Sequence, residues 1–461
     1  MLQRGSNGVR APRRSRTGRW TALAAAAGLA LTGCASGEGD ARPEIVVAIV
    51  SNPQMQDAIS LQEDFAEKHP DIDVRFVSLP ENEARAKITA SVATGGGEFD
   101  VVMISNYETP MWAENGWLTN LQDYADTTEG YDPDDFVPTI REALSYEGDL
   151  YSVPFYGESS FLAYRTDLFE EAGLEMPETP TWEQVRGFAE QLHDPDAGFS
   201  GICLRGLAGW GEIMAPLSTV MNTYGGRWFD ADWNAELDSP EVEAAVTDYV
   251  ELVRSYGQPG AATSGYGDCL TRYAQGDAAM WYDATAMVSA IEDPASSTVV
   301  GRTGYVQAPV QETESAGWLY SWSLAIPATS DQKDAAWDFV SWMTDKDYMR
   351  LVGEEIGWER VPPGSRMSTY EIPEYAEVSS AYSEPTLQAM ASAAQETSMT
   401  ERVPYPGLQF VGIPEFQDLG TRVAQQISAA VAGQKSVPEA LEQAQQYAET
   451  VGESYQSGEG R

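Results

Sequence analysis

The sequence predicts an α/β protein of two lobes, each a mixed sheet flanked by helices, with a helical C-terminal part. Short β-branched runs alternate with amphipathic segments over residues 44–104, the order typical of parallel strands joined by right-handed helical crossovers. The 461 residues are more than one hydrophobic core usually holds. Beyond residue 362 the apolar periodicity is mainly helical.

The first lobe is expected to begin at residue 44, where the run EIVVAIV reads as a buried strand between two prolines. Similar runs predict strands at residues 44–50, 73–79, 99–104 and 322–326. Apolar residues at helical spacing predict helices at residues 55–68, 82–93 and 332–343. We therefore assign residues 44–154 and 305–345 to the first lobe.

The second lobe is expected to begin where Pro154 and Gly157 interrupt an apolar run, and the chain should return near residues 304–309. Thr181 and Gln184 have the spacing of a capping box. Strands are predicted at residues 201–205 and 278–283. Helices are predicted at residues 166–172, 213–224, 240–256, 269–275, 414–432 and 437–451. The second lobe then comprises residues 155–304 and 346–461, with hinges near residues 154–157 and 305–309.

Residues 1–33 have the pattern of a secretory signal, with clustered arginines before a short apolar run over residues 20–31. The sequence Leu31-Thr32-Gly33-Cys34 that follows resembles a bacterial lipobox. This resemblance implies acylation of Cys34, a tether over residues 34–43, and a soluble domain anchored at the extracellular face of the cell membrane. The alternative is an ordinary signal peptide with an incidental cysteine.

Composition limits the partners and cofactors of the protein. The formal net charge of −43 repels nucleic acid and anionic lipid, so neither is expected to bind. His69 and His193 have no Cys or His at ligand spacing, and we expect no metal and no cofactor. An oxidising compartment permits a disulfide between Cys203 and Cys269, but the spacing alone leaves this pairing open.

Polar and aromatic side chains gather at predicted strand ends, where open α/β sheets bind ligands. The sequence is also rich in aromatic residues, with 13 Trp and 22 Tyr. Carbohydrates have apolar C–H faces and hydroxyl rims, so their sites combine aromatic walls with acids, amides and arginine. The candidate ligand-binding residues are Glu81, Asn82, Asn106, Tyr107, Glu108, Tyr156, Glu158, Arg205, Trp210, Glu212, Trp281, Asp283 and Trp322. For each tryptophan taken alone, core packing is the favoured interpretation; the group as a whole favours a ligand site.

An enzyme is the main alternative, because two carboxylates can hydrolyse a glycoside. No pair of acids stands out in this sequence, and it contains neither a Gly-x-Ser-x-Gly elbow nor a phosphate-binding loop. A pair of lobes without ligand, serving in adhesion or sensing, is a further alternative.

Seven segments carry a resemblance to a known family: PENEARAKITASVATGGGEFDVVMISNYETPMWAENGWL (80–118), PFYGESS (154–160), GICLRGLAGWGE (201–212), GGRWF (225–229), MWYDAT (280–285), VPPGSR (361–366) and VPYPGLQFVGIPEFQ (403–417). The chain resembles the extracellular solute-binding proteins of bacterial ABC sugar importers, in the branch that binds sorbitol and mannitol. The segment between Trp318 and Trp322 departs from the pattern.

This resemblance implies a two-lobed periplasmic-binding-protein fold of type II, with the ligand captured between the lobes by hinge closure. It also implies a monomer that delivers a polyol to permease subunits and performs no catalysis. A cyclic mono- or oligosaccharide is the alternative ligand, and a lipid-anchored glycoside hydrolase is the alternative activity.

Overall fold

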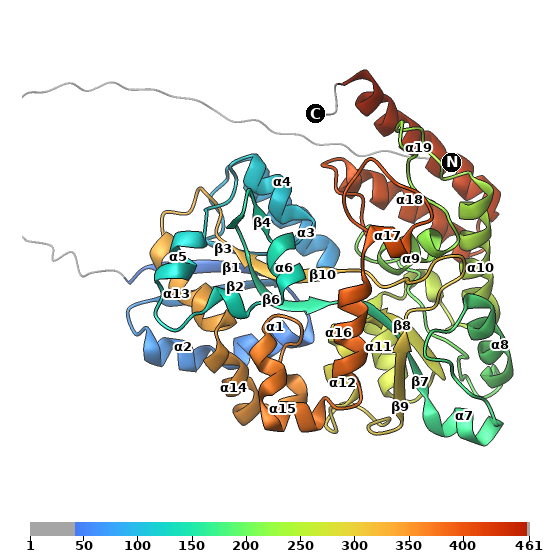
Figure 1. Ribbon diagram of the computed structural model, residues 1–461, viewed down its shortest axis with the longest axis horizontal. Helices are drawn as coiled ribbons and strands as arrows, with labels where there is room; N and C mark the ends of the chain where they lie inside the picture. The colour runs from blue at the N-terminus through green and yellow to red at the C-terminus, as the bar shows by residue number, and fades with distance from the viewer. Residues whose placement is uncertain (1–41, 459–461) are drawn as a thin grey trace, which may run out of the picture. The chain divides into compact units, whose positions relative to one another are not determined.

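Two β-sheets organise the computed structural model, which describes residues 42–458 (Figure 1). The larger sheet has five strands in the order β2-β1-β3-β10-β6. Its strands are β1 Glu44–Val50, β2 Asp73–Leu79, β3 Val101–Ser105, β10 Tyr320–Ala325 and β6 Val153–Glu158. β1 is parallel to β2 and β3, whereas β10 is antiparallel to both β3 and β6. The first lobe therefore contains a mixed sheet, as predicted.

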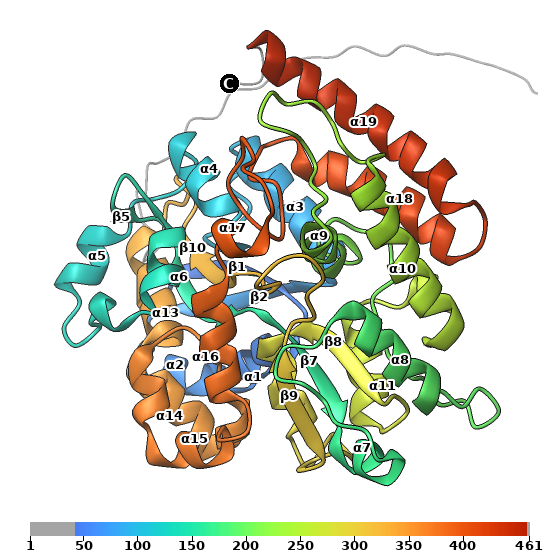
Figure 2. The same cartoon turned by 45° about the vertical axis from the view of Figure 1, so that its right-hand side comes forward.

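Helices cover both faces of this sheet. In Figures 1 and 2, α3 and α4 lie above the sheet, and α1 and α2 lie below it. The helices are α1 Pro53–Ser60, α2 Gln62–Lys68, α3 Glu81–Ala93, α4 Glu108–Glu114, α5 Gln122–Thr127, α6 Pro138–Ala143 and α13 Lys333–Thr344. The single helix expected at 55–68 is two helices, because the backbone at Leu61 leaves helical geometry.

The smaller sheet has three antiparallel strands in the order β8-β7-β9, namely Met280–Ala284, Ser160–Arg165 and Thr303–Gln307. The prediction of a strand at residues 201–205 is wrong. This part of the chain makes only isolated β-bridges, between Ser200 and Ala278 and between Cys203 and Trp281 of β8. The Gln258 side chain binds both backbone groups of Leu204, donating to its carbonyl over 2.7 Å. A side-chain amide thus occupies the place of a neighbouring strand.

The remaining helices follow β7 along the chain, and most of them lie beside the second sheet or in the C-terminal part. They are α7 Thr166–Ala172, α8 Trp182–Leu192, α9 Met214–Thr223, α10 Pro240–Tyr256, α11 Tyr266–Ala274, α12 Val288–Ile291, α14 Lys346–Glu355, α15 Pro373–Val378, α16 Ser383–Ser392, α17 Gln395–Ser398, α18 Phe416–Val431 and α19 Val437–Ser457. The predicted capping box is present at Thr181. Figure 2 shows α18 and α19 lying along α10.

The chain first passes between the sheets at Ser159, which separates β6 from β7. The boundary expected between residues 154 and 155 falls inside β6, because this strand continues to pair with β10 as far as Glu158. The boundary expected between 304 and 305 falls inside β9. α14, which we had assigned to the second lobe, packs against α13.

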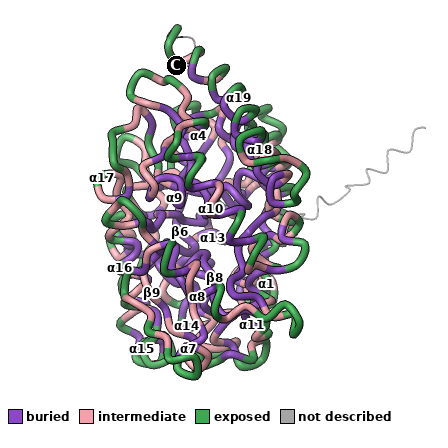
Figure 3. The backbone as a smooth tube through the Cα atoms, turned by 90° about the vertical axis from the view of Figure 1, so that its right-hand side faces the viewer, coloured by how far each residue is buried: buried purple, intermediate pink, exposed green. Residues whose placement is uncertain are grey.

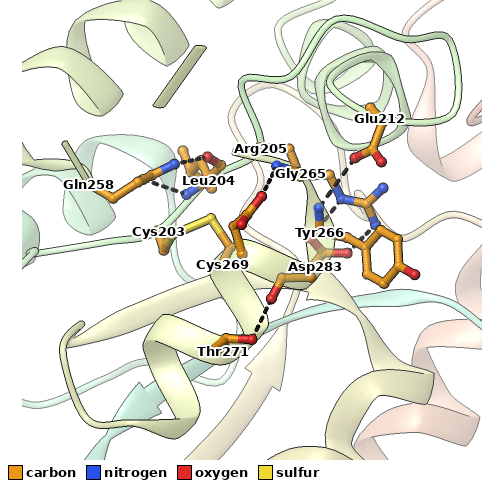
Figure 4. The surroundings of a disulfide bond; sticks show 12 residues. Cys203, Leu204, Arg205, Glu212, Gln258, Gly265, Tyr266, Cys269, Thr271 and Asp283 are labelled. Carbon is orange, nitrogen blue, oxygen red and sulfur yellow. Dashed lines mark hydrogen bonds and ion pairs between the residues drawn. A yellow bond between two sulfur atoms is a disulfide. The ribbon is translucent and has the colours of Figure 1, made fainter. Parts of the chain in front are cut away.

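A disulfide joins Cys203 to Cys269, whose Cα atoms lie 5.4 Å apart (Figure 4). It ties the irregular segment around Cys203 to α11, a separation of 66 residues. A loop of this length limits the unfolded chain enough to stabilise the fold by about 4 kcal/mol.

Buried residues form a continuous core in the interior of the described structure, and exposed residues lie mainly on the outer helices and loops (Figure 3). Within residues 42–458, no helix is both long and apolar enough to cross a bilayer. The predicted signal sequence, Cys34 and most of the tether lie outside the described residues.

Candidate functional site

One edge of the five-stranded sheet brings polar residues together beside the second lobe. Because β6 is parallel to β3, the carboxyl ends of β1, β2, β3 and β6 share this edge with the start of antiparallel β10. The edge forms the first-lobe wall of a cavity, lined by Val50, Asn52, Glu81, Arg85, Tyr156, Glu158, Tyr320 and Trp322.

The opposite wall of the cavity comes from the second lobe and the C-terminal segment. It consists of Arg205, Gly211, Ala215, Tyr266, Ala284, Met287, Gln409 and Phe410. Sites for small molecules combine apolar walls with a few directed polar groups. The cavity has this character and draws its walls from both lobes.

Arg85 on α3 is the central cation of the first-lobe wall. Its guanidinium donates to the Tyr320 hydroxyl over 2.6 Å, to Glu81 over 2.9 Å and to Glu108 over 3.3 Å. The guanidinium carbon also lies 4.2 Å from the ring centroid of Trp210 and 4.4 Å from that of Trp322. Burial alone lowers the pKa of Arg85, but Tyr320 and the two glutamates raise it above its ordinary value, so the group stays charged.

Arg205 is the corresponding cation of the second lobe (Figure 4). It forms a two-pronged ion pair with Asp283, with Nε donating over 2.8 Å and Nη2 making the second bond. Nη1 donates to the carbonyl of Gly211 over 3.0 Å. The guanidinium carbon lies 5.5 Å from the ring centroid of Tyr266. The disulfide is close by, since Cys203 precedes Arg205 by two residues and Cys269 follows Tyr266 by three.

Two buried glutamates change the charge of the cavity. Burial raises the pKa of Glu158 to about 8; Asp283 and Glu81 add to this shift, and Arg205 opposes it. Burial also raises the pKa of Glu212, and the neighbouring Glu81 contributes in the same direction. At pH 7 the Glu158 carboxyl is therefore mainly protonated, and it can donate one hydrogen bond as well as accept others.

The structure brings most of the predicted residues to this cavity. Five of them line it: Glu81, Tyr156, Glu158, Arg205 and Trp322. Four others contact a lining residue from behind: Glu108 and Trp210 contact Arg85, Asp283 contacts Arg205, and Glu212 accepts the backbone N–H of Tyr266.

The remaining four predicted residues do not line this cavity. Asn82 is exposed and donates to the carbonyl of Ala208 over 3.4 Å. The side chains of Asn106 and Tyr107 bind backbone groups, and both residues line a neighbouring cavity. Trp281 is fully buried in the second lobe, where Phe161 and Tyr273 cover it.

Sequence reasoning missed five lining residues that carry a polar side-chain group, namely Asn52, Arg85, Tyr266, Tyr320 and Gln409. Two of these had a usable signal: Asn52 follows the end of a predicted strand, and Arg85 lies one helical turn after Glu81. Asn52 donates to the Tyr156 hydroxyl over 2.9 Å. No local pattern marks the other three residues.

Direct contacts close the lobes around the cavity. The Tyr266 hydroxyl donates to the carbonyl of Ser51 over 3.1 Å, and Gln54 donates to the carbonyl of Ala286 over 2.9 Å. Gly211 approaches α3 so closely that a Cβ at this position would lie 2.5 Å from Glu81 Oε1 and 2.9 Å from Arg85 Nε. The fold and this enclosed polar cavity define a two-lobed protein that captures a small polar solute between its lobes.

This chain belongs to the family of bacterial extracellular solute-binding proteins, whose family model matches residues 52–350. It is 43% identical over 403 residues to a mannitol-binding protein of Pseudomonas aeruginosa, covering 87% of this chain and 91% of the relative. Family membership confirms the prediction of a solute-binding protein rather than an enzyme, and it places the protein outside the cytoplasm.

Solved structures agree with this assignment. An ABC transporter solute-binding protein of Agrobacterium vitis S4, with bound D-mannitol, has a TM-score of 0.87 and 43% identity, covering 90% of this chain and 99% of that one. A second solute-binding protein, from Agrobacterium radiobacter K84 in complex with ribitol, has a TM-score of 0.77 and 26% identity. The match covers 88% of this chain and 98% of that one. The predicted type II periplasmic-binding-protein fold is confirmed.

The close approach at Gly211 leads to a prediction about the closed arrangement. Gly211→Ala should weaken ligand binding at least tenfold, because the added methyl group collides with Glu81 and Arg85 when the lobes meet. Gly187→Ala on α8 is the matched control, since a Cβ there meets nothing within 4 Å. Titration calorimetry against a panel of polyols and sugars would measure both variants. Equal affinity of Gly211→Ala and the unmodified protein would show that this contact is not required.

Glu158 should make stability depend on pH. Its pKa is about 8 in the folded protein against an ordinary 4.5, so the folded state binds the proton more tightly than the unfolded state. The resulting stabilisation is complete below about pH 4.5 and disappears as pH rises through about 8, on the order of 4 kcal/mol in total. Glu158→Gln should therefore match the unmodified protein near pH 5 and exceed it in free energy of unfolding near pH 9.

Urea unfolding of the ligand-free protein at pH 5, 7 and 9 would check this expectation. Glu170→Gln, which alters an exposed carboxylate on α7, is the control and should show no such trend. If the free energy of unfolding of Glu158→Gln differs from that of the unmodified protein by the same amount at all three pH values, the raised pKa of Glu158 is contradicted.

Proposed function

We propose that this protein binds an acyclic polyol of about six carbons, such as D-mannitol or sorbitol, for uptake by an ABC importer. The observation that carries this proposal is the 43% identity, over nearly the whole chain, to a protein named as mannitol-binding and to a structure with bound D-mannitol. The cavity supports it, because its acids, guanidinium groups and phenols match a ligand with a hydroxyl on every carbon.

The arrangement of the two lobes suggests how capture would work. A polyol that contacts Glu81 and Arg85 in one lobe and Arg205 and Tyr266 in the other binds best when the lobes are together. Such a ligand shifts the population toward the closed form. We place one hinge at Ser159, between β6 and β7, and a second in the segment between β9 and β10. The closed form then delivers the polyol to the permease subunits.

We also propose that the protein works as a monomer attached to the membrane through acylated Cys34. The lipobox-like sequence before Cys34 supports attachment, and the contribution of about 0.8 kcal/mol per buried methylene makes several acyl chains a stable anchor.

Binding of hexitols is the direct test. Calorimetry of the domain lacking residues 1–41 should show one-to-one binding of D-mannitol or sorbitol, and much weaker binding of D-mannose and maltose. Arg205→Ala should weaken binding by about 1.5–3 kcal/mol, the contribution typical of a charge-assisted hydrogen bond. Arg186→Ala, which removes an ion pair with Asp248 on the second lobe, should leave the affinity unchanged. The absence of heat with every hexitol would exclude the proposed ligand class.

The anchor is tested separately in a bacterium that processes lipoproteins. The full chain should incorporate labelled palmitate and sediment with membranes, whereas Cys34→Ser should lose the label and appear in the soluble fraction. A labelled Cys34→Ser protein would place the modification at another residue.

A further inference from the structure

A second cavity lies directly beside the first one. Its lining includes Asn106, Tyr107, Met111, Tyr146 and Pro406. Three residues line both cavities: Tyr320, Gln409 and Phe410. These three residues, which we call the dividing wall, separate a cavity with four charged side chains (Glu81, Arg85, Glu158 and Arg205) from one with a single charged side chain, Glu114, among its described lining residues.

The dividing wall is held firmly by its neighbours. The Tyr320 hydroxyl accepts a hydrogen bond from Arg85 over 2.6 Å. The Phe410 ring lies in an aromatic cluster, with its centroid 4.9 Å from that of Trp210 and 5.8 Å from those of Tyr320 and Phe416. Such packing leaves little freedom for the wall to swing aside.

The loop that carries Gln409 and Phe410 is bound to both lobes. Asn222 of α9 donates to the carbonyl of Leu408 over 3.0 Å, and the Tyr107 hydroxyl donates to the carbonyl of Ile413 over 2.8 Å. The loop turns at Gly407, whose φ of +97° is available mainly to glycine, and a Cβ there would collide with the carbonyl of Phe410. The backbone thus fixes the wall independently of any ligand.

Gln409 also has an unused hydrogen-bonding atom. The side chain is only 5% exposed, and within the described chain its Oε1 has no hydrogen-bond partner. A buried acceptor without a partner costs free energy. A ligand hydroxyl at the end of the first cavity would satisfy it.

We propose that the dividing wall sets the length of the ligand. It ends the first cavity after a single alditol chain, with Gln409 Oε1 accepting from a hydroxyl near that end, and it excludes alditols that carry a pyranose ring. This inference rests on the proposed polyol function and defines its substrate range. Opening the wall would join the cavities and give the pyranose ring an aromatic-lined space next to Tyr107 and Tyr146.

The test compares two ligands that differ only by a sugar ring, D-glucitol and its 4-O-glucoside maltitol. In the unmodified protein the dissociation constant of maltitol should exceed that of D-glucitol at least a hundredfold. Phe410→Ala should reduce this ratio at least tenfold, mainly through tighter binding of maltitol. Phe416→Ala is the matched control, because it truncates the same aromatic cluster without lining either cavity, and it should leave the ratio unchanged.

Gln409→Ala provides a variant that spares the aromatic cluster. Its side chain makes no hydrogen bond within residues 42–458 that folding would lose, and it should also lower the ratio while weakening D-glucitol binding several-fold. A ratio near one in the unmodified protein, or an unchanged ratio in both wall variants, would overturn the proposal. Failure of the unmodified protein to bind D-glucitol and D-mannitol would overturn the polyol function and this inference together.

Discussion

Two buried arginines impose the main physical constraint on this structure. A guanidinium group removed from water must be surrounded by acceptors, because an unpaired buried charge is strongly destabilising. Arg85 meets this requirement with Glu81, Glu108 and Tyr320 of the first lobe, and Arg205 meets it with Asp283 and Gly211 of the second. Each arginine is thus satisfied by polar partners within its own lobe. Each half of the site is therefore organised before the ligand arrives.

The acids around these arginines leave an excess of negative charge in the cavity, which must be reduced. Seven carboxyl and guanidinium groups lie in or behind the cavity walls: Glu81, Arg85, Glu108, Glu158, Arg205, Glu212 and Asp283. Five are acids and two are bases, and a neutral ligand supplies no compensating charge. Burial raises the pKa values of Glu158 and Glu212, so protonation reduces the excess of negative charge. The same protons give the site donors as well as acceptors, as a polyhydroxy ligand requires.

The sequence predicted the alternation of strands and helices well, since apolar periodicity directly reports which faces are buried. It failed at residues 201–205, where the distant Gln258 side chain replaces a strand partner. It also failed at Leu61, where one helical pattern conceals a break. Strand-end position identified Glu81 and Glu158, because the edge of a sheet follows from its topology. Arg205 was also predicted from a strand end, but the segment before it is not a strand. Trp281 shows the limit of that rule, since it lies before the end of β8 and is covered by other side chains.

Tyr320 and Gln409 could not be found from local patterns, because only the tertiary fold brings β10 and the C-terminal loop to the same cavity.

Ser159 links the cavity to the connection between the two sheets. This residue alone separates β6 from β7. Its N–H donates to the Thr285 hydroxyl over 3.1 Å, and its carbonyl accepts from the backbone N–H of Thr285 over 2.8 Å. Any rotation of one sheet relative to the other must twist this residue, which directly follows Glu158. A ligand that contacts Glu158 would therefore act directly on the hinge proposed at Ser159, the next residue of the backbone.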